Sequence, residues 1–363
     1  MANSINGVPL KIITSLFLCG VLFLSAGCLC QSVPGIYIFG DSLVDVGNNN
    51  HLPLSLLKAN FPHNGIDFPT GKATGRFSNG KNGADFLAEK VGLPTAPPYL
   101  SLGSGIPITG VSFASGGAGL FNRTDDHFRQ AISMTQQVEY FSLVHDQLVK
   151  QLGLDGARAH LAKSLFLIVI GSNDLFAYFR NNSKVSKQYT PQQYVDLMAS
   201  TFKELMKRLY GMDARKFGVT GVGVIGCCPA RRKQTATKEC NLEANVWAIN
   251  YNIGLKLLLH DLKSELLDIN YSYFDTYGVE NNIIQNPQSH GITEIKEACC
   301  GLGNMKAAIP CVPIATYCSN RRDHLFWDRV HPSETVSSLF ADLFYNGPQQ
   351  VTFPTNIEQL VKL

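Results

Sequence analysis

A serine, a histidine and an aspartate in this sequence have the residue types and neighbours that can activate a hydroxyl group. Ser42 follows an apolar run and a Gly-Asp pair in FGDSLVDVGNNN, and Asp328 precedes His331 by three residues in FWDRVHP. A serine hydroxyl is a weak nucleophile until a base removes its proton, and histidine titrates near neutrality. A carboxylate beside the histidine orients the imidazole and stabilises its charged form. These residues therefore predict acyl transfer with Ser42 as the nucleophile.

Two further stretches contain the donors that this chemistry needs. ASGGAG includes Gly117 and GSND includes Asn173, and each stretch follows an apolar run. The tetrahedral intermediate of acyl transfer carries an oxyanion, which preset donors stabilise from about 2.7–3.1 Å away. We expect the backbone N–H groups of Ser42 and Gly117, together with the side-chain amide of Asn173, to form an oxyanion hole.

Each of these stretches alone also has a structural explanation. Gly-Asp-Ser is an ordinary turn sequence, glycine-rich stretches after strands form tight turns, and Asn173 suits the cap of a helix. His331, which precedes a proline, suits an ordinary loop. The catalytic hypothesis depends on all four stretches lying together at the carboxyl ends of parallel strands, where functional residues collect in open α/β sheets.

The elements that must position these residues alternate along the chain. Apolar runs predict strands at 33–39, 108–114, 164–170, 215–223 and 271–277, and amphipathic patterns predict helices at 83–92, 133–153, 191–212, 241–266 and 333–346. This order predicts an α/β fold of three layers, α/β/α, with a central, mainly parallel sheet of about five strands. No linker, charge block or repeat divides the chain, so we expect a single domain over residues 31–363.

The composition narrows the class of protein. The chain has 363 residues, is 45% hydrophobic and carries a net charge of +3, which indicates a large core and gives no reason to expect a nucleic-acid partner. Residues 1–30 have the basic residue, apolar run and small residues of a signal peptide, and no later run is long enough for a transmembrane segment. The chain is therefore expected to be secreted, and its sequons at Asn122, Asn181 and Asn270 are expected glycosylation sites.

The cysteines fit an oxidising compartment. Beyond the predicted signal peptide the sequence has seven, in two clusters: Cys227, Cys228, Cys240, Cys299, Cys300, Cys311 and Cys318. An odd number predicts one free thiol among local disulfides. The paired cysteines are adjacent rather than spaced as CxxC, and the histidines form no cluster, so no metal is expected. The glycine-rich stretches at 221–226 and 65–73 lack the helix or the Ser/Thr of nucleotide-binding motifs, so no cofactor is expected.

Together these stretches resemble the plant GDSL-type esterase/lipases, a branch of the SGNH hydrolases. FGDSLVDVGNNN, GVSFASGGAG, IGSNDL and FWDRVHP are similar to the four signature blocks of that family, and the resemblance runs from about Val33 to about Tyr345. It implies a flavodoxin-like fold, a triad of Ser42, Asp328 and His331, and oxyanion donors at Gly117 and Asn173. Ser112 departs from the usual asparagine of the second block, at a position taken as structural support.

The resemblance also suggests how the cysteines pair. Most relatives lack a cysteine at position 228, which makes Cys228 the candidate free thiol. Cys227 and Cys240 then form the expected first bridge. The later four cysteines, Cys299, Cys300, Cys311 and Cys318, are expected to pair among themselves.

The resulting hypothesis is a secreted serine esterase/lipase of the apoplast or cell wall that hydrolyses small-molecule or lipid esters without a cofactor. Two alternatives remain open at this point. Transfer of the acyl group to an alcohol acceptor, as in cutin assembly or specialised metabolism, would use the same residues. The second alternative is a secreted binding protein with an inactive site, and the complete set of five candidate residues disfavours it.

Overall fold

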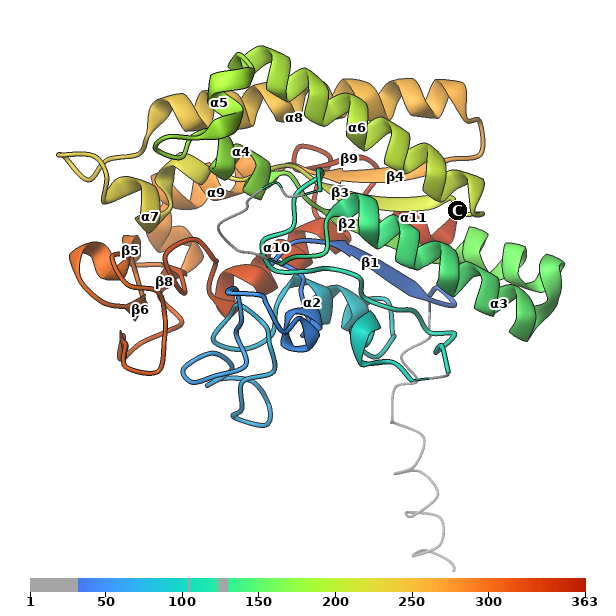
Figure 1. Cartoon of the computed structure of the whole chain (residues 1–363), viewed down its shortest axis with the longest axis horizontal. Coiled ribbons are helices and arrows are strands. Elements are labelled where there is room, and N and C mark those ends of the chain that lie inside the picture. The colour runs from blue at the N-terminus through green and yellow to red at the C-terminus, as the bar shows by residue number, and fades with distance from the viewer. Residues whose placement is uncertain (1–31, 104, 123, 125–129) are drawn as a thin grey trace, which may run out of the picture. The chain divides into compact units, whose positions relative to one another are not determined.

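The computed structural model describes residues 32–363 except 104, 123 and 125–129, so the predicted signal peptide at 1–30 lies outside the described residues. The centre of the fold is a five-stranded sheet (Figure 1). Strands β1 (Ile36–Gly40), β2 (Leu165–Val169), β3 (Lys216–Thr220) and β4 (Asn270–Phe274) are parallel and adjacent in that order. Strand β9 (Thr352–Pro354) joins β4 antiparallel. The predicted α/β class with a mainly parallel sheet is confirmed.

Residues 108–114, which the sequence predicts as a regular strand, do not form one. The segment follows the edge of β1, since Ile38 donates to the carbonyl of Val111 at 3.0 Å and accepts from Phe113 at 2.7 Å. Gly110 has φ +117, and a Cβ there would lie 1.8 Å from the carbonyl oxygen of Ile36. This left-handed residue breaks the extended conformation, so the segment forms only isolated bridges, from Ser112 to Ile38 and to Pro98.

The position of this segment still decides the topology. It lies beside β1, which pairs with β2 on its other side. Counted in chain order, the arrangement of segment and strands is 2-1-3-4-5, which is the flavodoxin-like order. The fifth ladder strand is β9, a three-residue strand that no apolar run predicted.

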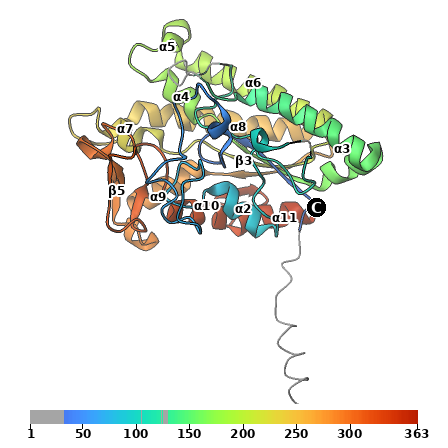
Figure 2. The same ribbon diagram turned by 60° about the horizontal axis from the view of Figure 1, so that its bottom comes forward.

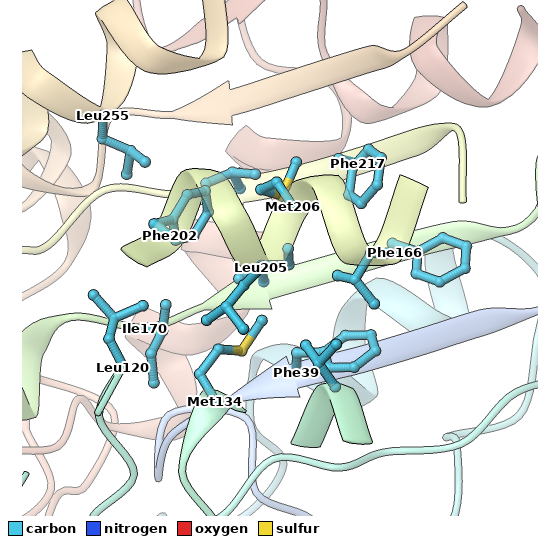
Figure 3. Packing of buried hydrophobic residues seen from close by; sticks show 14 of the residues in the cluster. Phe39, Leu120, Met134, Phe166, Ile170, Phe202, Leu205, Met206, Phe217 and Leu255 are labelled. Atoms are coloured by element: carbon cyan, nitrogen blue, oxygen red, sulfur yellow. The ribbon is translucent and has the colours of Figure 1, made fainter. Parts of the chain in front are cut away.

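One face of the sheet is covered by three long helices, α3 (Met134–Lys163), α6 (Pro191–Gly211) and α8 (Leu242–Glu265). Figure 3 shows Phe39, Phe166 and Phe217 of the strands in the same cluster as side chains of α6. All of these aromatic rings are fully buried. The helix predicted at 133–153 continues in the structure, but its backbone breaks at Gly153, where φ is 72° and ψ is 165°.

The opposite face is covered by shorter helices, namely α2 (Gly83–Lys90), α9 (Thr276–Gln285), α10 (Glu334–Asn346) and α11 (Ile357–Lys362). In β2, Phe166 and Ile168 pack on one face of the sheet while Leu165 and Leu167 pack on the other. Figure 2 shows helices on both sides of the strands. The nearly unbroken apolar sequence of β2 is therefore explained by burial on both faces.

Residues at the helix starts follow ordinary capping rules. The side chain of Thr190 accepts from the backbone of Gln193, whose side chain accepts from Thr190, and Pro191 occupies the first turn of α6. At α3, α8 and α10 the side chains of Ser133, Asn241 and Ser333 each accept a backbone N–H of the first turn. These caps satisfy N–H groups that have no partner within the helix.

The remaining elements lie mostly around the carboxyl edge of the sheet. The short helices are α4 (Ser172–Tyr178), α5 (Lys184–Gln188) and α7 (Pro229–Arg232). Two small sheets pair β5 (Glu294–Ala298) with β8 (His324–Phe326), and β6 (Cys300–Gly301) with β7 (Thr316–Tyr317). The 3-10 helices are Asn48–His51, Tyr99–Ser101, Ile225–Cys227, Pro287–His290 and Asn304–Lys306. Within the described ranges, no helix has the length and apolarity to cross a bilayer.

Candidate active site

Ser42 lies in the turn that follows β1. Gly40, the last residue of the strand, donates its N–H to the side chain of Gln137 and accepts from the same amide, both at 2.8 Å. A Cβ at Gly40 would lie 2.3 Å from the carbonyl oxygen of Val169, so the close approach of β2 requires glycine. Asp41 accepts the N–H of Leu43 at 3.0 Å and closes the turn. The strand end and the turn therefore hold Ser42 in place, with 9% of its surface exposed.

The residues after Ser42 connect the turn to the glycine-rich segment. Asp45 is fully buried and accepts the N–H groups of Gly47 at 2.7 Å, Asn48 at 2.8 Å and Gly116 at 2.9 Å. Asn49 donates to the carbonyl of Gly116 at 2.9 Å. Burial raises the pKa of Asp45 to about 6, against the lowering effect of these backbone donors. The run of asparagines is therefore structural: its side chains satisfy backbone groups of the neighbouring loop.

Asp328 and His331 lie on the short loop after β8. Asp328 accepts the backbone N–H groups of Val330 and His331, each at 2.9 Å, and its carboxylate lies 2.7 Å from Nδ1 of His331. Burial by itself would raise the pKa of Asp328, but the charge and hydrogen bond of His331 and the two backbone donors outweigh it and hold this pKa below its usual value. The aspartate is therefore ionised at neutral pH.

The loop and the turn bring a serine, a histidine and an aspartate into one hydrogen-bonded chain. Nε2 of His331 lies 2.7 Å from Oγ of Ser42. Because Nδ1 of the imidazole faces a carboxylate, the proton belongs on Nδ1, which leaves Nε2 to accept the hydroxyl proton of Ser42. The ring of Phe77 lies against that of His331, with ring centroids 5.0 Å apart. This packing limits the rotation of the imidazole.

The structure also brings Asn173 close to Gly117, and these are two of the three predicted oxyanion-hole residues. Asn173 donates its amide to the carbonyl of Ala118 at 2.9 Å, next to Gly117, whose φ is +83. In the described part of the chain, the backbone N–H groups of Ser42 and Gly117 donate no hydrogen bond. Asn173 and Ser42 line the cavity described below, whereas Gly117 lies beside its lining. Asn173 is not a helix cap, because Gly171 occupies the cap position of α4.

A further buried carboxylate fixes the GSND stretch. Asp174 accepts the N–H of Leu120 at 3.1 Å and the hydroxyl of Thr124 at 2.9 Å. Burial raises its pKa to about 7, and it raises that of Asp41 to about 7 as well. Neither of these carboxyl groups touches the histidine, so they serve the positioning of the loops.

The serine and the histidine face a cavity of about 640 Å³. The lining residues with exposed surface are Leu56, Asn181, Gln234 and Pro310, which mark its mouth. Arg231, Glu280 and Arg329 add charged groups to the lining. Burial raises the pKa of Glu280 to about 7, although the N–H of Val224 donates to this carboxyl. In the described residues no group of three His, Cys, Asp or Glu side chains could hold a metal ion.

The cysteines form three disulfides, Cys227–Cys240, Cys299–Cys318 and Cys300–Cys311. Cys228 is the free cysteine of the described residues and is buried against the cavity. Its thiol donates to the carbonyl of Ile225, and burial raises its pKa to about 11. A thiol held protonated in this way is a poor nucleophile.

The three sequons differ in their surroundings. Asn122 and Asn181 are exposed, and Asn181 lies at the mouth of the cavity. Asn270 begins strand β4, where its side chain accepts from Lys263 at 2.9 Å and Ser272 of the same sequon is fully buried. Glycosylation remains a prediction at all of them, and the folded surface favours the two exposed asparagines.

A hydroxyl, an imidazole and a carboxylate form one hydrogen-bonded chain at the carboxyl edge of a parallel sheet, beside a largely apolar cavity, and these are the groups of a serine hydrolase. The comparisons agree with this class. Residues 36–344 match the family model for GDSL-like lipase/acylhydrolase, and the chain belongs to this family of ester hydrolases.

Curated relatives from Arabidopsis thaliana cover nearly the whole chain. GDSL esterase/lipase At5g55050 is 48% identical over 341 residues, which are 91% of this chain and 90% of that protein. GDSL esterase/lipase At1g71691 is 37% identical over 333 residues, 91% of this chain and 86% of that protein. Among solved structures, a catalytic mutant of the acetylxylan esterase Axe2 from Geobacillus stearothermophilus matches at 14% identity with a TM-score of 0.37, covering 85% of this chain and 92% of that one.

Several residues that shape the site were not identified from the sequence. Gln137 lies in the first turn of α3 and Phe77 in a loop, and neither had a local signal that pointed to the site. Asp45 did have a local signal, because an acid two residues before Gly-Asn-Asn is typical of a turn closed by side-chain hydrogen bonds. Glu280 lies on α9, which the sequence analysis did not predict.

Proposed function

We propose that this protein hydrolyses carboxylic esters through an acyl-enzyme on Ser42, with His331 as the base and Asp328 as its partner. The observation that carries the proposal is the continuous chain from Oγ of Ser42 to Nε2 of His331, 2.7 Å, and from Nδ1 to Asp328, 2.7 Å. Both distances are short enough for proton transfer and for orientation of the ring.

The reaction has two balanced halves. Oγ of Ser42 bonds to the ester carbonyl carbon while its proton passes to Nε2 of His331, and the carbonyl oxygen becomes an oxyanion. As the intermediate collapses, the bond to the alcohol breaks and the alcohol oxygen takes the proton from the imidazolium. Water then attacks the acyl-enzyme with the same histidine as base, and release of the acid restores Ser42. Asp328 stays ionised throughout, which its lowered pKa favours.

We assign the oxyanion to the N–H groups of Ser42 and Gly117 and to the side chain of Asn173. In the described residues the two backbone groups donate no hydrogen bond, so they are available to a ligand. Asn173 has a second amide hydrogen besides the one bound by Ala118. Loss of a single such donor costs on the order of 10²–10³ in kcat in comparable sites.

Replacement of Ser42 by alanine tests the proposal. Ser42→Ala should lower kcat on p-nitrophenyl acetate by at least about 10⁴-fold and abolish labelling by a fluorophosphonate. Ser172→Ala is the matched control, since Ser172 also lines the cavity but lies outside the proposed triad. Full labelling of Ser42→Ala would remove this residue from the mechanism. An unlabelled and inactive wild-type protein would instead favour the binding-protein alternative.

Transfer to an alcohol would follow the same path to the acyl-enzyme, with an alcohol in place of water in the second half. The exposed residues at the mouth, Asn181 and Gln234, favour water access and hence hydrolysis. Product analysis with and without glycerol or a long-chain alcohol separates the two outcomes. A dominant ester product in dilute alcohol would make transfer the main activity.

We also propose that the protein is secreted. The predicted signal peptide at residues 1–30 and the three disulfides both point to an oxidising, extracellular compartment. Expression of the full chain in plant cells, followed by N-terminal sequencing of protein from the extracellular fluid, should give a start near Gln31. Retention of an intact N-terminus inside the cell would contradict this proposal.

A further inference from the structure

Helices α6 and α8 lie side by side on the same face of the sheet (Figure 1), but their outer surfaces differ. On α6 the series of exposed residues at every fourth position is polar throughout: Gln192, Asp196, Ser200, Glu204 and Arg208. On α8 a series of exposed residues at intervals of three and four is apolar throughout: Leu242, Val246, Ile249, Ile253 and Leu257. We call this second series the α8 stripe.

The α8 stripe lies opposite the side of the helix that enters the core. At 3.6 residues per turn, its five residues fall within about 80° of the helix circumference. Ala248, Leu255 and Leu262, on the other side of the helix, are fully buried. The stripe residues are between 37% exposed, at Ile249, and 74% exposed, at Leu242. A helix that is apolar on both sides is ordinarily buried, and spacing by three and four is the pattern of a helix–helix contact.

The size of the α8 stripe suits contact with a second copy of the chain. The exposed fractions of its residues correspond to an area on the order of 500 Å², and apolar patches of that size on monomeric proteins mark interaction sites. Two such stripes packed together would remove about 1,000 Å² from water, which is near the lower limit for a specific protein–protein interface. The area therefore fits a dimer that forms at micromolar concentrations.

The α8 stripe is also symmetric about its own middle. Leu242 and Leu257 are equally far from a point between residues 249 and 250, and so are Val246 and Ile253. Two copies of α8 packed antiparallel about a two-fold axis at that point would place Val246 against Ile253 of the second copy, and Leu242 against Leu257. A two-fold contact of this kind uses the same patch on both copies, so the patch has to be complementary to itself.

No charged residue interrupts the α8 stripe. Between Leu242 and Leu257 the charged residues of α8 are Glu243 and Lys256, at opposite edges of the stripe, and Nζ of Lys256 lies over the ring of Tyr273. In the antiparallel arrangement the two copies of Glu243 are about 20 Å apart along the helix axis, so salt screens their repulsion. An anionic lipid surface would instead favour basic residues around the stripe, whereas Glu243 and the exposed Asp261 are acidic.

We propose that the α8 stripe is the interface of a homodimer, in which two copies of this chain pack antiparallel through α8. Among the described residues that line the active-site cavity, none belongs to α8. Each copy would therefore keep its own open cavity. The proposal does not depend on the proposed function, and it can be tested without measuring ester hydrolysis.

Sedimentation velocity of the purified protein from about 1 to 100 µM tests the proposal, and the wild type should pass from monomer to dimer over this range. Ile253→Glu buries two unpaired carboxylates per dimer and should raise the dissociation constant at least about 100-fold. Ser200→Glu is the matched control, because it adds the same charge to the exposed face of the neighbouring helix α6. It should leave the dissociation constant unchanged.

The two-fold arrangement also predicts which variants restore the dimer. Val246→Lys and Ile253→Glu should each be monomeric alone. An equimolar mixture of the two should form heterodimers, since the introduced lysine and glutamate face each other across the axis once per dimer and the other Val246–Ile253 contact is intact. A mixture that stays monomeric would contradict the antiparallel arrangement.

The remaining outcomes are also decisive. A wild type that is monomeric at the highest concentration overturns the proposal, and so does a dimer that Ile253→Glu leaves unchanged. Flotation of monomeric wild type, but not of Ile253→Glu, with phosphatidylcholine vesicles would assign the α8 stripe to a lipid surface instead. Thermal melting of each variant shows that it is folded. If Ile253→Glu does not fold, the dissociation constant of Val246→Lys decides in its place.

Discussion

The two loops that carry the candidate catalytic residues are held in place by different means. The Ser42 loop, residues 41–50, contains no cysteine and is fixed by buried polar side chains such as Asp45 and Asn49, which bind backbone groups. The His331 segment, residues 294–331, contains two disulfides and a small apolar cluster around Trp327. Each of the two contains a residue of the same hydrogen-bonded chain, Ser42 in the loop and His331 in the segment.

The difference follows from the surroundings of the two regions. The Ser42 loop lies against the end of β1 and the glycine-rich segment, whose rigid backbone offers many donors and acceptors. Polar side chains are enough to fix a loop in that setting. The His331 segment forms its own two-stranded sheets and a cluster of few residues. A small core gives little stability, and disulfides replace what the missing burial would supply.

The carboxylates of the two regions also respond to pH in opposite directions. Burial raises the pKa of Asp41 to about 7, whereas His331 and backbone donors hold that of Asp328 below its usual value. Ionisation of Asp41 therefore works against folding as the pH rises. Ionisation of Asp328 favours folding above about pH 4, and this contribution is lost as the pH falls further.

The largest expected effect is loss of the polar network in the Ser42 loop. Asp45→Ala leaves three buried backbone N–H groups without an acceptor and should lower the free energy of unfolding by about 4 kcal/mol in urea titrations at pH 8. Asp45→Asn keeps one acceptor oxygen, so its free energy of unfolding should fall by less than that of the alanine variant. A change below about 1 kcal/mol in the alanine variant would show that the network is not what fixes this loop.

Removal of a disulfide is expected to have the second largest effect, and this effect should fall on the His331 segment. The Cys299–Cys318 bridge spans 19 residues, so the double variant Cys299→Ser/Cys318→Ser should lose about 3 kcal/mol. Hydrogen exchange should show lost protection in residues 294–331 and retained protection in residues 41–50. Cys228→Ala, which removes a cysteine but no bridge, is the control. Equal loss of protection in both regions would contradict independent anchoring.

The opposite pH responses give a prediction of intermediate size. The folded state keeps the proton of Asp41 up to about pH 7, whereas the unfolded chain releases it near pH 4. The protonated carboxyl of Asp41 therefore makes its full contribution to the free energy of unfolding below about pH 4, and this contribution declines as the pH rises to about 7. Asp41→Asn should remove the decline and be about 3 kcal/mol more stable relative to wild type at pH 8 than at pH 4.5. Parallel stability–pH curves for the two proteins would refute the assignment.

The smallest effect is expected at the contact that joins the His331 segment to the loop around residue 64. Nε1 of Trp327 donates to the side chain of Asn64 at 3.0 Å, and both residues are buried. Trp327→Phe keeps most of the apolar contact but leaves this acceptor unpaired, so it should cost about 1–2 kcal/mol. The double variant with Asn64→Ala should cost less than the sum of the single variants. Additive losses would show that the bond contributes nothing.

Much of this fold was predictable because the signals are local. Helices α2, α6, α8 and α10 begin and end within two residues of the predicted ranges, since periodicity and caps are sequence properties. Residues 108–114 were wrongly predicted as a strand because the effect of Gly110 depends on the carbonyl of Ile36, which approaches from another part of the chain. Strand β9 has three residues, too few for a pattern.

The sequence by itself determined the types of the candidate catalytic groups, their order and the alternation of elements that places them after strands. The Asp328–His331 pair is nearly local, because the two residues are three positions apart in the chain. Only the tertiary structure decided that this pair meets Ser42, 289 positions away in the chain, and that a largely apolar cavity extends from them beneath the sheet. Contacts between distant segments depend on how whole layers pack, and no single stretch of sequence encodes the packing of layers.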